Sequence, residues 1–267
     1  MVKVPNAEQW EMQSSAEKRK YQIIVHVPSI AAPPTGYPVI YLLDGNSVFA
    51  TMVEALRMQC HRPDKTGVVP AVIVGIGYQT NLPFAPDRYY DFTSIPTTEF
   101  SHTSDGTLLP KQGGAAAFLT FIEEELKPQI ESEFNINKSR QAIFGHSLGG
   151  LFALYVLFTK PSAFQSYIAG SPSIHWNKKI MFEAEQKFIS CLERSHINAE
   201  LLIGMGELEK QHVSRNYDHA KKLSDRLAAQ SNRGVNVKFA EFEGEGHTSV
   251  LPVLISRALR FALKPEK

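Results

Sequence analysis

The sequence predicts an α/β fold in which a mostly parallel central sheet carries helices on both faces. Short apolar runs alternate with longer segments of helical periodicity along most of the chain, as expected for strands joined by crossover helices. Two of these runs, 39–43 and 71–76, are continuously apolar, which is typical of strands buried on both faces. A third run, 142–144, leads directly into a glycine-rich turn that opens a helix. Without repeats or a linker, these observations indicate a single domain over residues 1–267.

The first half of the chain contains further expected elements around the two buried strands. Residues 21–27 should form an early strand that pairs antiparallel near one edge of the sheet. A helix is expected over 47–59, and another from 115 to about 134 with a kink at Pro128, because proline lacks the N–H that a helix needs. Residues 78–112 are irregular and rich in Pro, Thr, Ser and Asp. A loop of this length is usually functional or mobile, so we expect it near the active site.

The second half of the chain continues the same alternation to the C-terminus. Strands are expected over 141–144, 166–169, 200–203 and 235–239. Helices are expected over 150–159, 182–194, 213–230 and from 248 or 249 to 263, the last with Pro252 in its first turn.

Composition and charge argue against several classes of protein. The chain has 267 residues, 43% of them hydrophobic and 21% charged, which is ample for one large core. Its 28 Lys and Arg residues against 27 Asp and Glu residues give a formal net charge of +1, so no nucleic-acid partner is expected. The sequence contains no run of about eighteen apolar residues, so no membrane span is expected. The first twenty residues are polar and predict no signal peptide, so we expect a cytoplasmic protein, with its oligomeric state left open.

Cysteine and histidine spacing argues against a metal or redox site. Cys60 and Cys191 lack C-x-x-C spacing and are too few for a disulfide framework, so both are expected to be buried thiols. No H-E-x-x-H or comparable ligand pattern occurs among the nine histidines. We therefore expect neither a catalytic metal nor another cofactor.

The segment Gly145-His146-Ser147-Leu148-Gly149 has the G-x-S-x-G pattern of a nucleophile elbow. A serine that attacks a carbonyl carbon must project its Oγ from a sharp turn between a strand and a helix, and flanking glycines leave room for the crowded backbone. The predicted strand before this segment and the predicted helix after it match that context. Ser147 is therefore the candidate nucleophile, whereas His146 points away from the attacking face and is expected to serve in packing.

A nucleophilic serine needs a base, and usually an acid that orients the base. His247 lies in a loop between the last predicted strand and the last predicted helix, where the chain order serine, acid, histidine places the base. The acid should follow the strand at 200–203, where Glu207 and Glu209 are both available. We expect Glu209, because a small turn after the glycine usually precedes the acid. Glu207 is the alternative, and both could instead be solvated loop charges.

Two backbone N–H groups should face the substrate oxygen to form an oxyanion hole. Leu148, the residue after the nucleophile, is expected to supply one of them. The other should come from the turn Asp44-Gly45-Asn46 after the first buried strand, with the N–H of Asn46 preferred over that of Gly45. The same turn could also cap the following helix, which is compatible with both roles.

Six short segments in this order resemble a known family. They are 41–46 (Tyr-Leu-Leu-Asp-Gly-Asn), 88–93 (Arg-Tyr-Tyr-Asp-Phe-Thr), 145–150, 171–173 (Ser-Pro-Ser), 204–209 and 246–247 (Gly-His). Together they resemble the esterase-D-like esterases of the α/β-hydrolase superfamily. Within that family the chain looks most like the ferric-siderophore esterases that open trilactones such as enterobactin, salmochelin and bacillibactin. The resemblance extends from about residue 7 to the C-terminus.

The resemblance implies an α/β-hydrolase fold and a serine esterase that works through an acyl-enzyme on the trilactone of a catecholate siderophore. Iron would be present only as part of that substrate. The family pattern matches Ser147 as nucleophile, His247 as base and Glu209 as acid, although some members lack the acid and use a Ser–His dyad.

Two further residues are expected to contact the substrate. Arg88 matches a family arginine associated with substrate binding, and a guanidinium suits an anionic tris-catecholate complex. Its alternative role is a structural ion pair with Asp87 or Asp91. Trp176, just after the Ser-Pro-Ser segment, could form a flat wall for a catechol ring or could belong to the core.

Other activities remain open at this stage. Related families act on simple acyl esters, feruloyl esters or S-formylglutathione, so the alternative is a general small-acyl carboxylesterase or an S-formylglutathione-type thioesterase. A catalytically silent binding protein is a further alternative, because a fold does not guarantee an activity.

Overall fold

The computed structural model describes residues 3–103, 106–194 and 197–265. The strands are β1 (Ala7–Gln13), β2 (Lys20–His26), β3 (Tyr37–Leu42), β4 (Val72–Gly77), β5 (Ile136–His146), β6 (Ser166–Gly170), β7 (Ala199–Gly206) and β8 (Val235–Phe242). The helices are α1 (Gly45–Cys60), α2 (Pro63–Thr66), α3 (Arg88–Asp91), α4 (Ala115–Phe121), α5 (Lys127–Glu133), α6 (Leu148–Thr159), α7 (Lys178–Leu192), α8 (Asn216–Ala228) and α9 (Val250–Ala262). Shorter 3-10 segments occupy Ile174–Asn177, Glu207–Gln211 and Ser231–Arg233.

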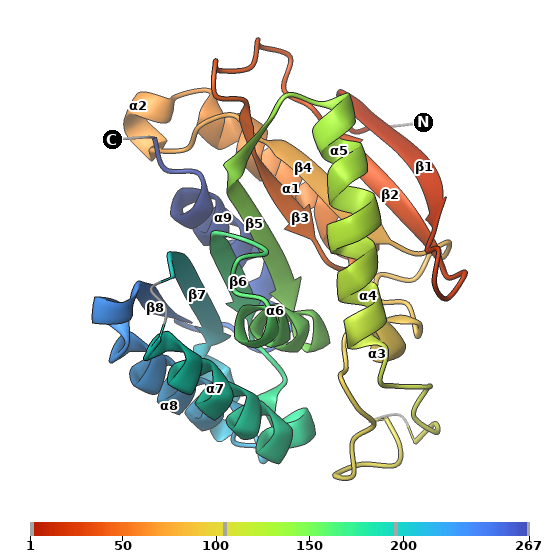
Figure 1. The fold of residues 1–267 in the computed structure, drawn as a ribbon, viewed down its shortest axis with the longest axis vertical. Coiled ribbons are helices and arrows are strands. Elements are labelled where there is room, and N and C mark those ends of the chain that lie inside the picture. Colours follow the sequence, from red (N-terminus) through yellow and green to blue (C-terminus); the bar gives the residue numbers. More distant parts are fainter. Residues whose placement is uncertain (1–2, 104–105, 195–196, 266–267) are drawn as a thin grey trace.

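The strands form one 8-stranded sheet in the order β1-β2-β4-β3-β5-β6-β7-β8 (Figure 1). β1 pairs antiparallel with β2, and β2 pairs antiparallel with β4, whereas the remaining pairs are parallel. This mostly parallel sheet with its covering helices is of the α/β-hydrolase type, so the predicted fold is confirmed. The prediction of a single domain over 1–267 stays a prediction, and the continuous sheet from β1 to β8 supports it.

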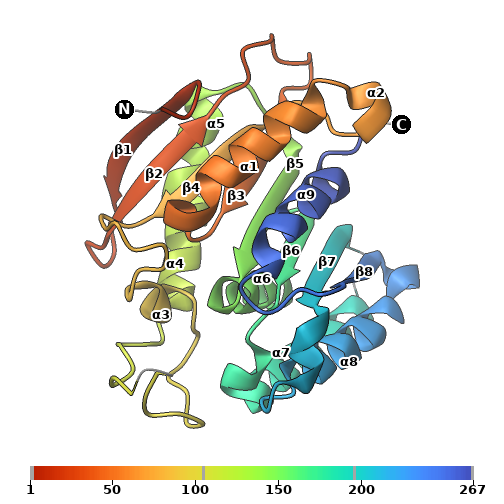
Figure 2. The ribbon, with the colours of Figure 1, turned by 180° about the vertical axis from the view of Figure 1, so that it is seen from behind.

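Helices cover both faces of the sheet. Figure 1 shows α4 to α8 in front of the sheet, and Figure 2 shows α1 and α9 over the opposite face. Neighbouring strand residues therefore belong to different cores, because successive side chains of a strand point to opposite faces. Tyr41 and Ile143 are buried in the cluster on the α4–α8 side, whereas Leu42 and Phe144 are buried in the cluster on the α1 and α9 side. Burial of both faces explains why these strands read as continuous apolar runs.

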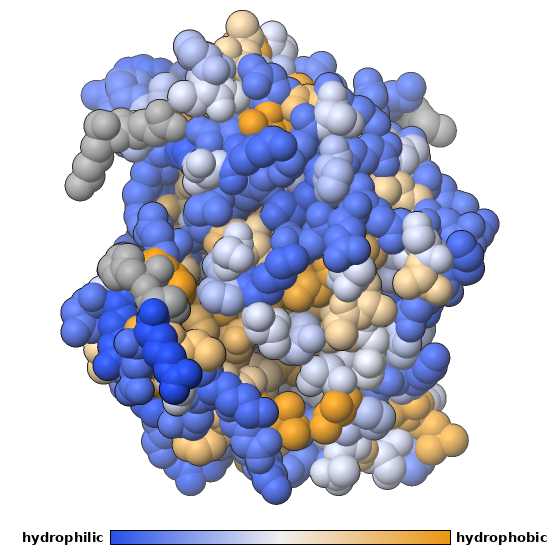
Figure 3. All heavy atoms as spheres, viewed as in Figure 1, coloured by the Kyte–Doolittle hydropathy of each residue, from blue (hydrophilic) through white to orange (hydrophobic). Residues whose placement is uncertain are grey.

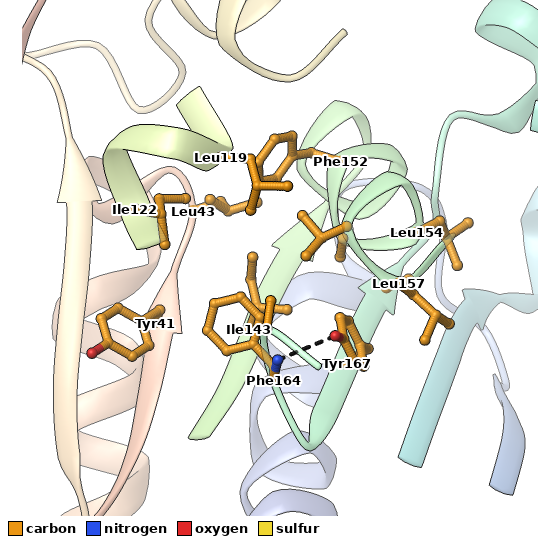
Figure 4. Close-up of a cluster of buried hydrophobic side chains, with 14 of the residues drawn as sticks. Tyr41, Leu43, Leu119, Ile122, Ile143, Phe152, Leu154, Leu157, Phe164 and Tyr167 are labelled. Carbon is orange, nitrogen blue, oxygen red and sulfur yellow. Dashed lines mark hydrogen bonds between the residues drawn. The ribbon is translucent and has the colours of Figure 1, made fainter. Parts of the chain in front are cut away.

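The core on the α4–α8 side packs directly beneath the strand that leads to Ser147. Figure 4 shows Ile143 of β5 surrounded by side chains of β3, of α6 and of the loop before β6. The aromatic ring of Phe164 lies 5.7 Å from that of Tyr41, and its N–H donates to the Tyr167 hydroxyl at 3.2 Å. Each such fully buried large side chain contributes about 1.5–3 kcal/mol, so the end of β5 rests on a well-packed support.

One strand has no counterpart in the sequence-based prediction. β1 pairs with β2 from Ala7 opposite His26 to Gln13 opposite Lys20 and forms an edge of the sheet. Its side chains are largely polar; Trp10 and Met12 pack against one core cluster and Ala7 against the other. A polar edge strand of this kind carries little hydrophobic periodicity, so its sequence gave no signal.

Two predicted helices differ from the structure in instructive ways. The long helix around Pro128 is not a simple kinked α-helix, because a π-helical turn at Ile122–Leu126 separates α4 from α5. This wide turn lies just before Pro128 and accommodates a residue that has no N–H. The helix expected from residue 213 begins at Asn216, because Arg215 has a left-handed backbone with φ 52°, which no α-helix continues.

The expected burial of both cysteines is wrong. Cys60 is half-buried and Cys191 is exposed. Cys60 is the last residue of α1, and Cys191 lies in the final turn of α7. Both thiols therefore lie where helices leave the packed layers.

The segment 78–112 contains the short helix α3 and is otherwise mostly irregular, and its residues 104–105 lie outside the described part of the chain. Figure 1 places it at the lower end of the molecule, where the parallel strands end. Asp91 anchors the segment, because its carboxylate accepts hydrogen bonds from Arg19 Nε at 2.9 Å and from the Tyr21 and Tyr78 hydroxyls at 3.2 and 2.8 Å. The anchored part of the segment thus lies beside the carboxyl edge of the sheet.

Candidate active site

The strand ladder brings three chain turns together at the carboxyl edge of the sheet. β5, β6 and β7 are neighbours, with His146 opposite Gly170 and Gly170 opposite Gly204. The Ser147 N–H donates to the Gly170 carbonyl at 2.8 Å, and the Ser171 N–H donates to the Gly204 carbonyl at 2.7 Å. Residues that immediately follow these strands therefore meet, which is where α/β sheets bind their ligands.

Ser147 occupies a strained elbow between β5 and α6. Its backbone has φ 58° and ψ −117°, a conformation that non-glycine residues rarely adopt. A Cβ at Gly145 would lie 2.1 Å from the Gly149 carbonyl oxygen, and one at Gly150 would lie 2.8 Å from the Gly170 carbonyl oxygen. At Gly149 the nearest contact would be an ordinary 3.4 Å, so the crowding is at positions 145 and 150.

The three residues expected to form a catalytic triad meet in the structure. His247 Nε2 lies 3.1 Å from Ser147 Oγ, and His247 Nδ1 lies 2.8 Å from Glu209 Oε2. The serine follows β5, the acid follows β7, and the histidine lies between β8 and α9. A serine, a histidine and a carboxylate in this arrangement can activate the serine hydroxyl for attack on a carbonyl carbon. We refer to Ser147, His247 and Glu209 as the triad.

Glu209, rather than Glu207, faces the histidine. Its Oε1 accepts hydrogen bonds from the Ser171 hydroxyl at 2.6 Å and from the Gly206 N–H at 2.9 Å. Burial disfavours the charged carboxylate, but the donors from His247, Ser171 and Gly206 outweigh it and hold the pKa of Glu209 below its usual value. Glu207 instead accepts the Gly244 N–H at 3.1 Å. The two carboxylates of this loop therefore have different partners, one in the triad and one along the neighbouring loop.

His146 does more than the packing expected of it. Its ring is buried, and Nε2 lies 2.7 Å from the carbonyl oxygen of His247. Burial, reinforced by the charge that His247 can carry, lowers the pKa of His146 to about 4, so the ring is neutral near pH 7. Since a carbonyl only accepts, Nε2 carries the proton and donates it. His146 thus ties the elbow to the loop that carries His247.

The two proposed sources of the oxyanion hole are placed differently. Leu148 opens α6, where the first N–H groups of a helix lack intrahelical partners, and it lines the pocket in front of Ser147. Gly45 and Asn46 open α1 beside the elbow but do not line that pocket. The Asn46 side chain instead binds the next segment, because Nδ2 donates to the Tyr78 carbonyl and Oδ1 accepts the Tyr78 N–H, each at 2.8 Å.

Arg88 forms a buried ion pair with a partner that the sequence analysis did not predict. Its Nε and Nη2 donate to the two carboxylate oxygens of Asp44 at 2.8 and 2.9 Å. Nη2 also donates to the His146 carbonyl at 3.2 Å. The expected alternative partners, Asp87 and Asp91, pair with Arg19 instead. A bidentate pair of this kind is rigid, so Arg88 fixes the Asp44 turn against the elbow.

A pocket of about 410 Å³ opens in front of Ser147, within the usual range for small-molecule sites. Its wall includes Tyr89 and Trp176, whose ring centroids lie 5.6 Å apart. Phe100 of the 78–112 segment packs on Trp176 with a centroid distance of 5.6 Å. Trp176 is half-buried and donates from Nε1 to Gln112 Oε1 at 3.0 Å. The indole therefore belongs to the pocket wall and is held by the long segment.

The surface around this end of the molecule is comparatively apolar. Figure 3 shows a mostly hydrophilic face with hydrophobic side chains gathered toward its lower end, where Figure 1 places the 78–112 segment. The exposed large hydrophobic residues of that segment include Ile95, Phe100 and Leu108. The pocket thus lies close to a segment that exposes apolar side chains.

Several residues of the site had no role in the sequence analysis. His175, Asn216 and Ser173 line the pocket, and the Ser173 hydroxyl lies 3.1 Å from Ser147 Oγ. The signal that could have found Ser173 is its place just after β6, because polar residues that follow adjacent parallel strands meet at one edge. His175 lies in the short 3-10 segment Ile174–Asn177, which no periodicity predicts, whereas Asn216 begins α8 within the predicted helix 213–230.

The structure also bears on metals and membranes. Among the described residues, no group of three or more His, Cys, Asp and Glu side chains could hold a metal ion. No helix in the described ranges is long and apolar enough to cross a membrane.

Comparison with known proteins gives matches along nearly the whole chain. Residues 14–250 match the family described as Putative esterase. The chain is 55% identical over 265 residues to the ferri-bacillibactin esterase BesA of Bacillus subtilis (strain 168), a match that covers 98% of this chain and 91% of that protein. It is 38% identical over 214 residues to the siderophore enterobactin esterase of Emericella nidulans, covering 77% of this chain and 69% of that protein.

A solved structure has the same fold over its full length. The BES protein from Bacillus cereus superposes with a TM-score of 0.91 at 45% sequence identity, covering 99% of this chain and 98% of that chain. The similarity therefore includes every strand that leads to the triad.

Proposed function

The chain belongs to the Putative esterase family and is an ester hydrolase, and we propose that Ser147, His247 and Glu209 carry out its reaction. The observation that carries this proposal is the unbroken hydrogen-bond path from Ser147 Oγ to His247 and from His247 to Glu209, at 3.1 and 2.8 Å. Such a path activates a serine, which is a weak nucleophile by itself.

Each step of the proposed reaction uses a group that the site provides. Ser147 Oγ attacks the ester carbonyl carbon and gives its proton to His247 Nε2, which then protonates the leaving alcohol. Water, activated by the same nitrogen, attacks the acyl-enzyme and releases the acid. Glu209 keeps the imidazole oriented and stabilises its charged form. The Leu148 N–H, with a second N–H from Asn46 or Gly45, is proposed to stabilise the oxyanion.

The substrate we propose is the ester of a siderophore, and specifically the trilactone of a catecholate siderophore. The similarity to a ferri-bacillibactin esterase, at 55% identity, supports this class. The aromatic wall of Tyr89 and Trp176 supports it as well, because a catechol ring can stack against such side chains. Iron would enter the site only within the substrate.

Arg88 and Trp176 are proposed to contact this substrate. Nε and Nη2 of Arg88 are engaged by Asp44 and His146, and Nη1 has no hydrogen-bond partner among the described residues. Because Asp44 compensates the guanidinium charge, we expect Arg88 to offer one directed hydrogen bond rather than a free positive charge. Trp176 would offer its ring face.

The test is product analysis with purified protein. It is incubated with an iron-loaded and an iron-free catecholate trilactone, and in parallel with p-nitrophenyl acetate and butyrate. We expect efficient trilactone opening, visible as linear products by chromatography and mass spectrometry, and complete loss of turnover in Ser147→Ala with the fold retained by circular dichroism. Fast cleavage of simple esters with an untouched trilactone would remove the siderophore assignment and favour a small-acyl esterase or thioesterase. Full activity of a pure Ser147→Ala sample would remove Ser147 from the mechanism.

Other properties of the chain stay predictions. We propose that the reaction needs no cofactor, that the only partner it requires is a small-molecule ester, and that the protein acts in the cytoplasm without nucleic acid. Fractionation and activity after treatment with a chelator test these points.

A further inference from the structure

One turn after β6 touches both ends of the triad. Ser171 is fully buried, and its hydroxyl donates to Glu209 Oε1 at 2.6 Å. Two residues later, Ser173 is 4% exposed, and its Oγ lies 3.1 Å from Ser147 Oγ. We refer to residues 171–173 as the Ser171–Ser173 turn. It reaches the acid with its first hydroxyl and the nucleophile with its second.

The direction of the Ser173–Ser147 hydrogen bond follows from the protons available. A carboxylate only accepts, so His247 Nδ1, 2.8 Å from Glu209 Oε2, carries a ring proton. When His247 acts as the proposed base, Nε2 has no proton and accepts. The single hydroxyl proton of Ser147 is given to Nε2 at 3.1 Å. The contact between the two serine oxygens then needs the proton of Ser173. Ser173 is therefore the donor and Ser147 Oγ the acceptor.

The turn is built to hold these hydroxyls in place. Ser171 has φ 38°, a strained value for a residue with a side chain. The Ser173 N–H donates to the Ser147 carbonyl at 3.1 Å, and Asn216 Nδ2 donates to the Pro172 carbonyl at 2.8 Å. The backbone that carries the Ser171 and Ser173 hydroxyls is therefore held in place by hydrogen bonds, so neither hydroxyl can easily reach another partner.

We propose that the Ser171–Ser173 turn positions the triad, with Ser173 holding Ser147 Oγ toward His247 while Ser171 holds Glu209. The inference rests on the proposed serine esterase function. During attack the Ser147 O–H bond breaks and its proton moves to His247 Nε2. The Oγ–carbon bond forms, and the carbonyl π pair moves to the carbonyl oxygen. Ser173 keeps its own proton throughout and stabilises the negative charge that Oγ acquires before the new bond is complete.

The test compares wild type with Ser173→Ala and Ser173→Thr. Steady-state hydrolysis of p-nitrophenyl acetate and the rate of labelling by a fluorophosphonate probe are measured across a pH series. We expect Ser173→Ala to lose about 3- to 10-fold in kcat and in labelling rate, the range of one neutral hydrogen bond, with KM nearly unchanged. Ser173→Thr keeps a hydroxyl and should recover most of the rate. Ser224→Ala on α8, which changes an equally buried serine (3% exposed), is the matched control and should match wild type.

A second variant separates the two hydroxyls of the turn. Among the described residues the Ser173 hydroxyl contacts only Ser147 Oγ, so its loss should lower the rate without moving the pH profile. Ser171→Ala removes a donor from Glu209, which makes that carboxylate more basic and its attraction for the His247 proton stronger. We therefore expect Ser171→Ala to shift the acid limb of kcat/KM toward higher pH.

The outcomes distinguish this inference from the function on which it rests. A wild-type protein that neither labels at Ser147 nor hydrolyses the ester would overturn both. Labelling of wild type together with an equal rate in Ser173→Ala would overturn the inference alone. A Ser173→Thr protein that folds but is as slow as Ser173→Ala would also overturn it, because the hydroxyl would then not be the group that matters.

Discussion

Two turns at the carboxyl edge of the sheet meet at Ser147 but are held in opposite ways. The Ser171–Ser173 turn is fully buried and carries a hydrogen bond at each of its residues. The loop 243–249 after β8 is largely exposed, and the His247 side chain is 43% exposed. Rigid backbone thus sets Ser147 and Glu209, whereas His247 is presented from a loop at the surface. In the proposed reaction His247 moves a proton twice in each turnover, and a partly solvated loop is compatible with that task.

The exposed loop is held by a few specific contacts from neighbouring residues. His146 donates to the His247 carbonyl, Glu207 accepts the Gly244 N–H, and the Glu245 carbonyl accepts the Leu208 N–H. Only the first of these comes from a buried ionisable side chain. This contrast predicts large effects for changes to buried side chains and small effects for changes to the exposed contacts that hold the loop backbone, with His146 as the link between the two turns.

The largest effect is expected from the two glutamates that the sequence left as alternatives. Glu209→Gln keeps the shape but removes the charge that orients His247, so kcat should fall about 10³- to 10⁴-fold. Glu207→Gln changes a half-buried residue that binds only the loop backbone and Lys210, and should cost less than about 10-fold. Steady-state kinetics of both variants on one ester checks the contrast. Similar losses in the two variants would mean that the acid is not held as the hydrogen bonds indicate.

The structure brings together the three residues that the sequence proposed as a triad, because each lies in a loop that follows a recognisable strand. The apolar runs of β5 and β7 and the alternating pattern of β8 identify the sheet, and the loops at its carboxyl edge then contain few candidate residues. Glu209 could be preferred over Glu207 only weakly, because a 3-10 turn at Glu207–Gln211 decides which carboxylate faces inward. Ser173 and His146 had no predicted contact with the triad, because such contacts depend on side-chain directions that periodicity does not encode.

The partner of Arg88 shows the same limit. Asp87 and Asp91 are the partners that the sequence predicts for Arg88, since short separation is the only guide to ion pairing along a chain. Asp44, which lies 44 positions away, reaches Arg88 because β3 ends beside the elbow and α3 of the 78–112 segment lies there too. Long-range pairs of this kind come from topology, so the predicted role of Arg88 in substrate binding is joined by a structural one.

The second prediction concerns the buried ion pair of Arg88 and Asp44, which holds the Asp44 turn against the elbow. Asp44→Ala would leave the Arg88 guanidinium, 8% exposed in its side chain, without its counter-charge. We expect a loss of about 3–5 kcal/mol in the free energy of unfolding, measured by urea denaturation. Asp218→Ala is the matched control, because it breaks the exposed pair with Arg215 and should cost less than about 1 kcal/mol. Equal losses would show that the Asp44 pair is not sealed from solvent.

The third prediction uses His146, the link between the two turns, through the pH dependence of stability. Its pKa is about 4 in the folded protein against 6.5 for an ordinary histidine. As the pH falls below 6.5, the His146 ring is protonated in the unfolded chain but stays neutral in the native state. The native state therefore loses stability as the pH falls to about 4, and below that pH His146 causes no further loss. The full loss is about 3 kcal/mol for His146.

His146→Gln retains a donor for the His247 carbonyl but cannot titrate, so its free energy of unfolding should fall less steeply over the same window. The other acid-sensitive groups, Glu209 among them, are present in both proteins and cancel in the difference. Unfolding curves of wild type and His146→Gln measured from pH 7 to pH 4 test this. If the free energy of unfolding depends on pH in the same way in both proteins, then His146 is accessible to protons in the native state and is not a buried link between the Ser171–Ser173 turn and the exposed loop.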